Sequence, residues 1–209
     1  MTVTKLDLYN QALGTLGERS LASLSENREP RRLLDGAWNR GAVDFCLGQA
    51  PWTFALRASQ LDHDPSITPD FGYIYAFAIP DDCVQPWSVC SEEYFRYPLT
   101  RFVNESGYIY ADITPVYIRY VSNDPAYGGD MSKWGRQFQA YVAAYLANEI
   151  ALKLTQSENK ANAAERRMAK AEKEAKGSDA VASPPVFFPP GRMVLSRSGG
   201  SVRYQDMRR

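Results

Sequence analysis

The spacing of apolar residues changes twice along the chain, and each change marks a different kind of structure. Near the N-terminus, apolar residues recur every three or four positions, which is the period of an amphipathic helix. This pattern predicts helices over residues 4–17 and 30–48. Thr4 with Asp7 resembles a capping box at the start of the first helix, and Gly17 ends it. The second predicted helix has one apolar stripe, which is formed by Leu34, Trp38, Gly41 and Phe45.

The period shortens to two between residues 52 and 121, which is typical of strands with one buried face. Alternation begins at Trp52, Phe54 and Leu56 and returns over residues 73–79. A polar turn at residues 104–107 predicts a hairpin, and residues 116–121 form a further apolar run. We therefore expect a small, mostly antiparallel sheet within residues 52–121.

Helical spacing returns over residues 132–156 and 158–176, and Gly177 is predicted to end the last helix. That helix carries a heptad seam built mainly of alanine: Ala161, Ala164, Met168, Ala171 and Ala175. Alanine side chains let two helices approach closely but bury little apolar area each. Two interpretations stay open. The seam packs within its own subunit, or it forms a contact between subunits.

Residues 178–209 show no periodicity and form an extended C-terminal arm in this interpretation. Prolines and glycines recur in the arm, and its five arginines stand against Asp179 and Asp206. Such a segment cannot fold around its own core, so it is either disordered or docks into a groove of a partner. The side chains that favour docking are Phe187, Phe188, Arg192, Leu195, Arg197, Arg203 and Tyr204.

These elements together predict the α+β class. A helical bundle from the two ends of the chain surrounds an inserted antiparallel sheet, which gives one domain over residues 1–177 followed by the arm.

Composition narrows the function classes. The 24 basic and 24 acidic residues give no net charge, whereas a dedicated nucleic-acid binder has a basic excess. The sequence starts without a signal-peptide pattern, and no run approaches the roughly 20 apolar residues that span a bilayer. We therefore expect a soluble protein made in a cytoplasm. Its three cysteines are expected to be reduced, and their spacing together with His63 matches no zinc module.

The side chains that could take part in catalysis or binding also have structural interpretations. Asp81 and Asp82 follow Pro80 and are expected in a turn, because adjacent residues rarely address one substrate. Glu92 with Glu93 is interpreted in the same way, and His63 is expected in a solvated loop. Trp52 and Phe54 are expected in the core, with an interface role as the alternative. No catalytic triad, phosphate-binding loop or dinucleotide motif is present in the sequence, so we expect neither an enzyme nor a cofactor.

Several motifs in a fixed order resemble the tail tubular protein A family of podophages and related head-to-tail adaptors of tailed phages. The resemblance covers roughly residues 5–176. It rests on residues 12–18 (ALGTLGE), the loop with Ser20, Leu21 and Leu24, residues 50–54 (APWTF), 79–82 (IPDD), 117–121 (YIRYV), Asp124-Pro125 and the helix from Phe138 to Ile150. The chain differs in having Pro51 where glycine is common and in its long C-terminal arm.

The resemblance implies a structural role at the head–tail junction of a virion. Its implied partners are a portal protein, a downstream tail or nozzle protein and further copies of itself, in a ring usually of twelve. Double-stranded DNA would pass through the ring without specific binding. Two alternatives stay open at this stage: another tail-completion role, and a peptidoglycan hydrolase carried in the virion.

Overall fold

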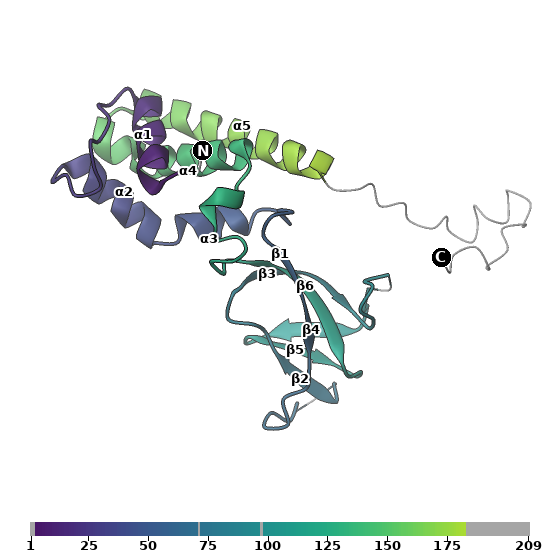
Figure 1. Cartoon of the computed structure of the whole chain (residues 1–209). Coiled ribbons are helices and arrows are strands. Elements are labelled where there is room, and N and C mark those ends of the chain that lie inside the picture. The colour runs from purple at the N-terminus through teal and green to yellow at the C-terminus, as the bar shows by residue number, and fades with distance from the viewer. Residues whose placement is uncertain (1–2, 71, 97, 183–209) are drawn as a thin grey trace, which may run out of the picture.

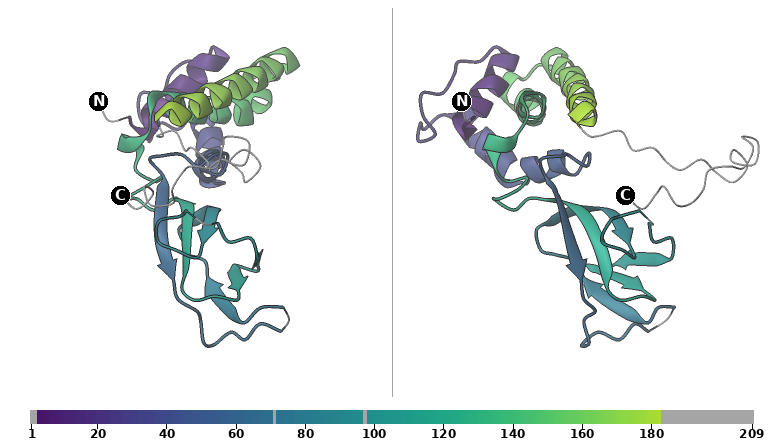
Figure 2. Two further views of the ribbon diagram at one scale, coloured as in Figure 1. Left: turned by 90° about the vertical axis from the view of Figure 1, so that its right-hand side faces the viewer. Right: turned by 45° about the vertical axis from the view of Figure 1, so that its right-hand side comes forward.

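The chain folds into a layer of helices and a smaller β region that lies at one end of that layer (Figure 1). A computed structural model describes residues 3–70, 72–96 and 98–182. Two further views show the same end-to-end stacking of the two regions (Figure 2). The mixed α+β class expected from the sequence is confirmed.

The helical layer is organised around α4 (Arg136–Thr155), which contacts every other helix of the layer. The surrounding helices are α1 (Lys5–Leu16), α2 (Glu29–Asn39), α3 (Ala42–Leu47) and α5 (Glu158–Ala182). Buried residues occur on most sides of α4, from Phe138 near its start to Ala151 near its end. Its role as the central element explains why its sequence is apolar beyond a single stripe.

The start and end of α1 follow the expected local chemistry. The Thr4 side chain accepts a hydrogen bond from the Asp7 backbone N–H, and the Asp7 carboxylate accepts one from the Thr4 backbone N–H at 2.9 Å. These bonds satisfy two of the backbone donors that a helix start leaves free. Gly17 then ends α1 in the left-handed conformation, with a φ of 75°.

The helix predicted over residues 30–48 is broken in two, so that prediction is wrong in its continuity. Gly41 has a φ of 88°, which separates α2 from α3 and turns the chain. Because of this turn, Phe45 does not lie on the buried stripe, and 47% of its surface is exposed. Leu34 remains in the core as the pattern predicted.

Helix α5 is longer than predicted, since it continues through Gly177 to Ala182. The first five residues assigned to the arm are therefore helical. A physical reason is the carboxylate of Asp179, which hydrogen-bonds to Thr53 and so gives the last turns of α5 a tertiary contact.

The β region contains two three-stranded antiparallel sheets instead of the single sheet expected. In the first, β6 (Val116–Ser122) lies between β1 (Leu56–Leu61) and β3 (Cys83–Cys90). In the second, β5 (Tyr108–Ala111) lies between β2 (Tyr75–Ala78) and β4 (Phe102–Glu105). The expected hairpin is present as β4–β5 and turns at Ser106 and Gly107, both with positive φ.

Two strand predictions need correction. Residues 52–55 form a turn before β1 and not a strand, because Trp52 is drawn into the helical core. Strand β3 was not anticipated after the Pro80-Asp81-Asp82 break, and Pro86 within it is a poor strand residue. β3 is an edge strand whose pairing with β6 has register shifts on both sides of Gln85 and Pro86, a setting that tolerates proline.

Each region has its own core. The helical core includes Trp52 and reaches into the top of the first sheet through Val121. The β core is smaller and centres on Phe77, Ile109 and Ile118. None of the helices in the described part of the chain is long and apolar enough to cross a membrane.

Candidate assembly surfaces and the joint between them

The acidic pairs singled out in the sequence lie in turns or bends. Asp81 and Asp82 follow Pro80 in a turn, in which the Cys83 N–H donates to the Pro80 carbonyl at 2.9 Å. Glu92 accepts a hydrogen bond from the Arg96 backbone N–H in the bend after β3. The turn interpretation is therefore confirmed for Asp81 and Asp82, and only Asp82 is held by a side-chain network.

Asp82 holds three elements of the first sheet together. Its carboxylate accepts hydrogen bonds from Arg57 Nη1 at 2.9 Å, from Tyr120 Oη at 3.1 Å and from Ser122 Oγ at 2.5 Å. Although partial burial alone would raise the pKa of Asp82, the hydrogen bonds from Ser122, Arg57 and Tyr120 keep it below its usual value. Burial and the Asp82 charge in turn raise the pKa of Tyr120 to about 12.

A second set of contacts ties the start of β1 to the end of α5. Asp179 accepts hydrogen bonds from the Thr53 backbone N–H at 3.1 Å and from Thr53 Oγ1 at 2.7 Å. Trp52, beside it, is 1% exposed and donates from Nε1 to the Cys46 carbonyl at 3.0 Å. Its ring lies 4.8 Å from that of Phe138 in an edge-on arrangement, so the core interpretation of Trp52 is confirmed.

The loop after β6 completes this joint between the helical layer and the β region. Ser122 also accepts a bond from the Asp124 N–H through its hydroxyl, and the Gly128 N–H donates to its carbonyl. A Cβ at Gly128 would overlap that carbonyl and meet Ala55, so the loop needs glycine there. The helical layer and the β region therefore pack closely at this joint. We define it by Trp52, Thr53, Asp82, Ser122, Gly128 and Asp179.

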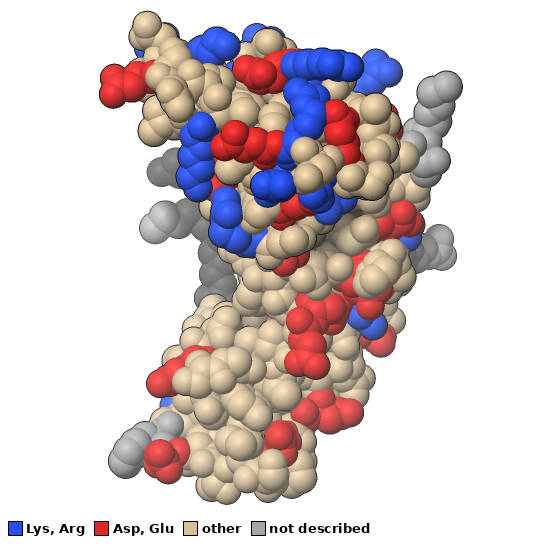
Figure 3. All heavy atoms as spheres, turned by 90° about the vertical axis from the view of Figure 1, so that its left-hand side faces the viewer, with Lys and Arg blue, Asp and Glu red and all other residues tan. Residues whose placement is uncertain are grey.

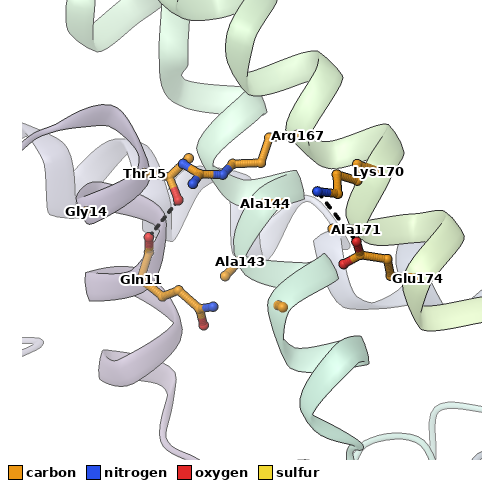
Figure 4. Close-up of a pocket in the computed structure, with 10 residues that line it drawn as sticks. Gln11, Gly14, Thr15, Ala143, Ala144, Arg167, Lys170, Ala171 and Glu174 are labelled. Atoms are coloured by element: carbon orange, nitrogen blue, oxygen red, sulfur yellow. Dashed lines mark hydrogen bonds and ion pairs between the residues drawn. The ribbon is translucent and has the colours of Figure 1, made fainter. Parts of the chain in front are cut away.

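A groove opens between α1 and α5, above the floor that α4 provides (Figure 4). It has a volume of about 410 Å³. Small residues line the floor, and Arg167 and Lys170 of α5 form part of its rim. The full lining is Gln11, Gly14, Thr15, Ala140, Ala143, Ala144, Arg167, Lys170, Ala171 and Glu174.

An apolar patch lies on another side of α4. Phe45 of α3 stacks on Tyr145 of α4 with ring centroids 4.7 Å apart, and Leu152 follows two turns later with 56% of its surface exposed. Glu149, which lies between Tyr145 and Leu152 along α4, forms an ion pair of 3.4 Å with Arg40. Exposed apolar side chains on one side of a helix are typical of interaction surfaces.

The β region carries a negative charge. Residues 56–122 contain nine Asp and Glu residues but only four arginines. In the face seen in Figure 3, red side chains occur on the β region with little blue, whereas the helical layer shows both colours. Trp87 of β3 and Tyr94, which follows β3, are also exposed, by 56% and 66%. The surface of the β region thus contains both acidic and aromatic groups.

The predicted seam residues of α5 pack against other helices of the same copy. Ala164 and Ala175 are buried, and Ala161, Met168 and Ala171 pack against the core that contains α4. All five therefore contact the core of their own copy, and a contact of the seam with a second copy stays a prediction. The other predicted contact residues lie outside the described residues, and they are Phe187, Phe188, Arg192, Leu195, Arg197, Arg203 and Tyr204.

Residues with possible metal or acid–base chemistry are dispersed. His63 is exposed in the loop after β1, with its ring 5.3 Å from that of Tyr75. Cys46, Cys83 and Cys90 are free thiols, and burial raises the pKa of Cys83 to about 11. Within residues 3–182, as far as they are described, no three His, Cys, Asp or Glu side chains gather as a metal site would require.

The sequence did not predict the groove, the patch or the Thr53–Asp179 contact. Gly14 in the last turn of α1 was the one available signal for the groove, because a glycine within a helix costs helix stability and leaves space beside the backbone. No protein-family model matches the chain, and no curated protein is significantly similar to it.

Proposed function

We propose that this protein is a structural head-to-tail adaptor of a tailed bacteriophage, seated in the virion between the portal and the tail. Copies of the chain form a ring, of twelve in the implied arrangement, that continues the channel for DNA. In this role the protein holds two partners at a fixed distance and angle, and it needs neither a catalytic group nor a cofactor.

The observation that carries the proposal concerns the motifs behind the family resemblance. Segments 50–54, 79–82, 117–121 and 138–150 are far apart in sequence, yet Trp52, Asp82, Tyr120 and Phe138 from them belong to the joint or pack against it. The side chains there are held by ring packing and hydrogen bonds. The motif residues thus set how the β region is joined to the helical layer. An adaptor needs such a defined geometry, because it must hold two partners in a fixed arrangement.

Charge supports the proposed relation to DNA. A chain with no net charge and a β region of nine acidic against four basic residues gives no general attraction for phosphates. A channel wall of this kind lets DNA slide, whereas a basic wall would retain it.

The arm is the proposed contact to the portal. Residues 183–209 lie outside the described residues, but they contain five arginines and both Phe187 and Phe188. Aromatic side chains in partner pockets would contribute most of the affinity, because ion pairs at an interface rim contribute only about 0–1 kcal/mol each.

The proposal is tested by mixing the purified chain with a candidate portal protein and imaging the particles by electron microscopy. We expect a ring of this chain on one face of the portal. A chain ending at Ala182 should stay folded and lose most of this binding, and Phe187→Ala with Phe188→Ala should weaken it more than Arg197→Ala with Arg203→Ala. Absence of any complex, or clearing of cell-wall material in a zymogram, would contradict the adaptor role.

A further inference from the structure

We propose that copies of this chain contact one another head to tail, with the Phe45–Tyr145–Leu152 patch of one copy seated in the α1–α5 groove of the next. The inference rests on the proposed ring. It names the two surfaces that would build the ring, and both lie in the described part of the chain.

The groove has the form of a receptor for bulky side chains. Its floor is made of Ala140, Ala143 and Ala144 of α4, and Gly14 and Ala171 add small walls. A second hollow of about 350 Å³ continues it past the end of α1 and shares Gly14, Thr15 and Arg167 with it. Small residues on three helices thus leave a space that no side chain within the described residues fills.

The patch offers bulky side chains that could enter such a groove. Phe45 and Leu152 each expose about half of their surface, at 47% and 56%. Phe45 is braced by its stacking on Tyr145, so it would lose little side-chain freedom when it is covered. A rigid aromatic next to an aliphatic side chain is a common anchor of protein interfaces.

The two surfaces point in different directions from the same helix. At about 100° per residue, the groove residues of α4 (Ala140, Ala143, Ala144) and its patch residues (Tyr145, Leu152) face about 140° apart. One copy therefore cannot bury its own patch in its own groove. Two different faces that pair between copies form a heterologous contact, which closes into a ring when the rotation allows it.

Charge favours a second copy over the chain's own C-terminal segment. The two hollows are bordered by Lys160, Arg167 and Lys170 against Glu174 alone. The acids beside the patch are Asp44, which is exposed, and Glu149, which is half-buried and paired with Arg40. Residues 183–209 carry five arginines and one aspartate, so they would bring positive charge to a positive rim.

The test blocks each surface by one substitution and measures self-association by sedimentation velocity over a wide range of concentration. Gly14→Leu would fill the groove, and it is expected to fold because nothing lies within 4 Å of the added Cβ. Leu152→Glu would place a charge in the patch. Each variant should weaken association of the chain by at least about tenfold, as loss of an interface anchor does. Gly14→Ala is the control for the groove and Ile74→Glu the control for an added surface charge, and both should associate like the wild type. Melting curves of all four variants should show intact folding.

Mixing the two blocked variants separates this contact from other modes of association. The patch of the Gly14→Leu copy and the groove of the Leu152→Glu copy are both intact. An equimolar mixture should therefore give dimers that neither variant forms alone, and should stop there. Wild-type association that either variant leaves unchanged, a mixture that stays monomeric while the wild type associates, or a wild type that stays monomeric at every concentration would overturn the proposal. If the wild type and both variants form the same ring on a portal, the adaptor role stands and this contact is wrong.

Discussion

The helical layer and the β region differ in how much of their surface is buried by contacts within the chain. Helix α4 is covered by four other helices, and the helical core continues from Leu8 in α1 to Ala175 in α5. The β region has two small sheets with a core of eight buried residues and several exposed edges. The helical layer therefore has the larger buried core, and the β region exposes more of its surface.

Charge separates the two regions in the same way. The β region has nine acidic and four basic residues, and exposes Trp87 and Tyr94. The described helical parts, residues 3–55 and 123–182, are close to neutral, with 14 acidic and 15 basic residues. In the proposed adaptor role, these chemically different ends would contact two different partners, and the joint would set the angle between them.

The comparison is tested most strongly by two tryptophans. Trp52→Ala should lower the free energy of unfolding by about 4 kcal/mol, because it removes a fully buried aromatic side chain from the helical core. Trp87→Ala, in β3, should change it by less than about 0.5 kcal/mol because the side chain is mostly exposed. Urea unfolding followed by circular dichroism measures both. Equal losses would mean that the β surface is not free in the folded chain.

The next largest effect is expected at the joint. Asp82→Asn should cost about 2 kcal/mol, because it weakens three hydrogen bonds to a partly buried carboxylate. Asp81→Asn is the control and should cost less than about 0.5 kcal/mol, since Asp81 is exposed. If the two neighbours give the same loss in urea unfolding, the Asp82 network does not hold the sheet to the joint.

The same carboxylate predicts a pH dependence. The pKa of Asp82 in the folded chain is lowered by its hydrogen bonds from Ser122, Arg57 and Tyr120, against the raising effect of burial. Its stabilising effect is therefore complete above the unfolded pKa of about 4 and is lost as the pH falls through the lower folded value. The difference in unfolding free energy between wild type and Asp82→Asn should shrink from pH 7 toward pH 2. A difference that stays constant with pH would contradict the assignment.

Two truncations separate the end of α5 from the residues that follow it. A chain ending at Ala182 should unfold like the full chain. A chain ending at Gly177 should lose about 1 kcal/mol, because it lacks the Asp179 carboxylate that binds Thr53. Asp179→Ala in the full chain should reproduce the second result, and identical melting curves for both truncations would contradict it.

The smallest expected effect has the opposite sign. Gly14→Ala should raise the free energy of unfolding by about 0.7 kcal/mol, because alanine favours the helix and its Cβ enters open space. A loss of stability would show that the groove beside Gly14 is less open than described. The measurement is the shift of the thermal midpoint.

Local signals in the sequence predicted the elements well, but they did not predict how distant parts meet. The capping box at Thr4 and the hairpin turn at Gly107 act within a few residues, and both were anticipated. Gly41 was misinterpreted because a glycine on a helical stripe resembles any small residue until its φ is known. Strand β3 was hidden because only its edge position makes Pro86 acceptable.

The candidate surfaces were less predictable than the fold, for a related reason. Thr53 and Asp179 are 126 residues apart, and nothing near either residue indicates the other. The groove is a property of three helices together, and Phe45 became surface only because the chain turned at Gly41. The alanine seam was visible, but its pattern alone did not decide between a partner helix in the same copy and one in another.

The bond between Asp179 and Thr53 also has a mechanical consequence. Tension applied to the chain beyond Ala182 passes along the last turn of α5 to Asp179, where the hydrogen bonds from Thr53 transmit part of it into the corner between α3 and β1. The backbone of α5 and its contacts with α4 carry the rest. A pull on the C-terminus would act on the joint, the place where the orientation of the β region is set.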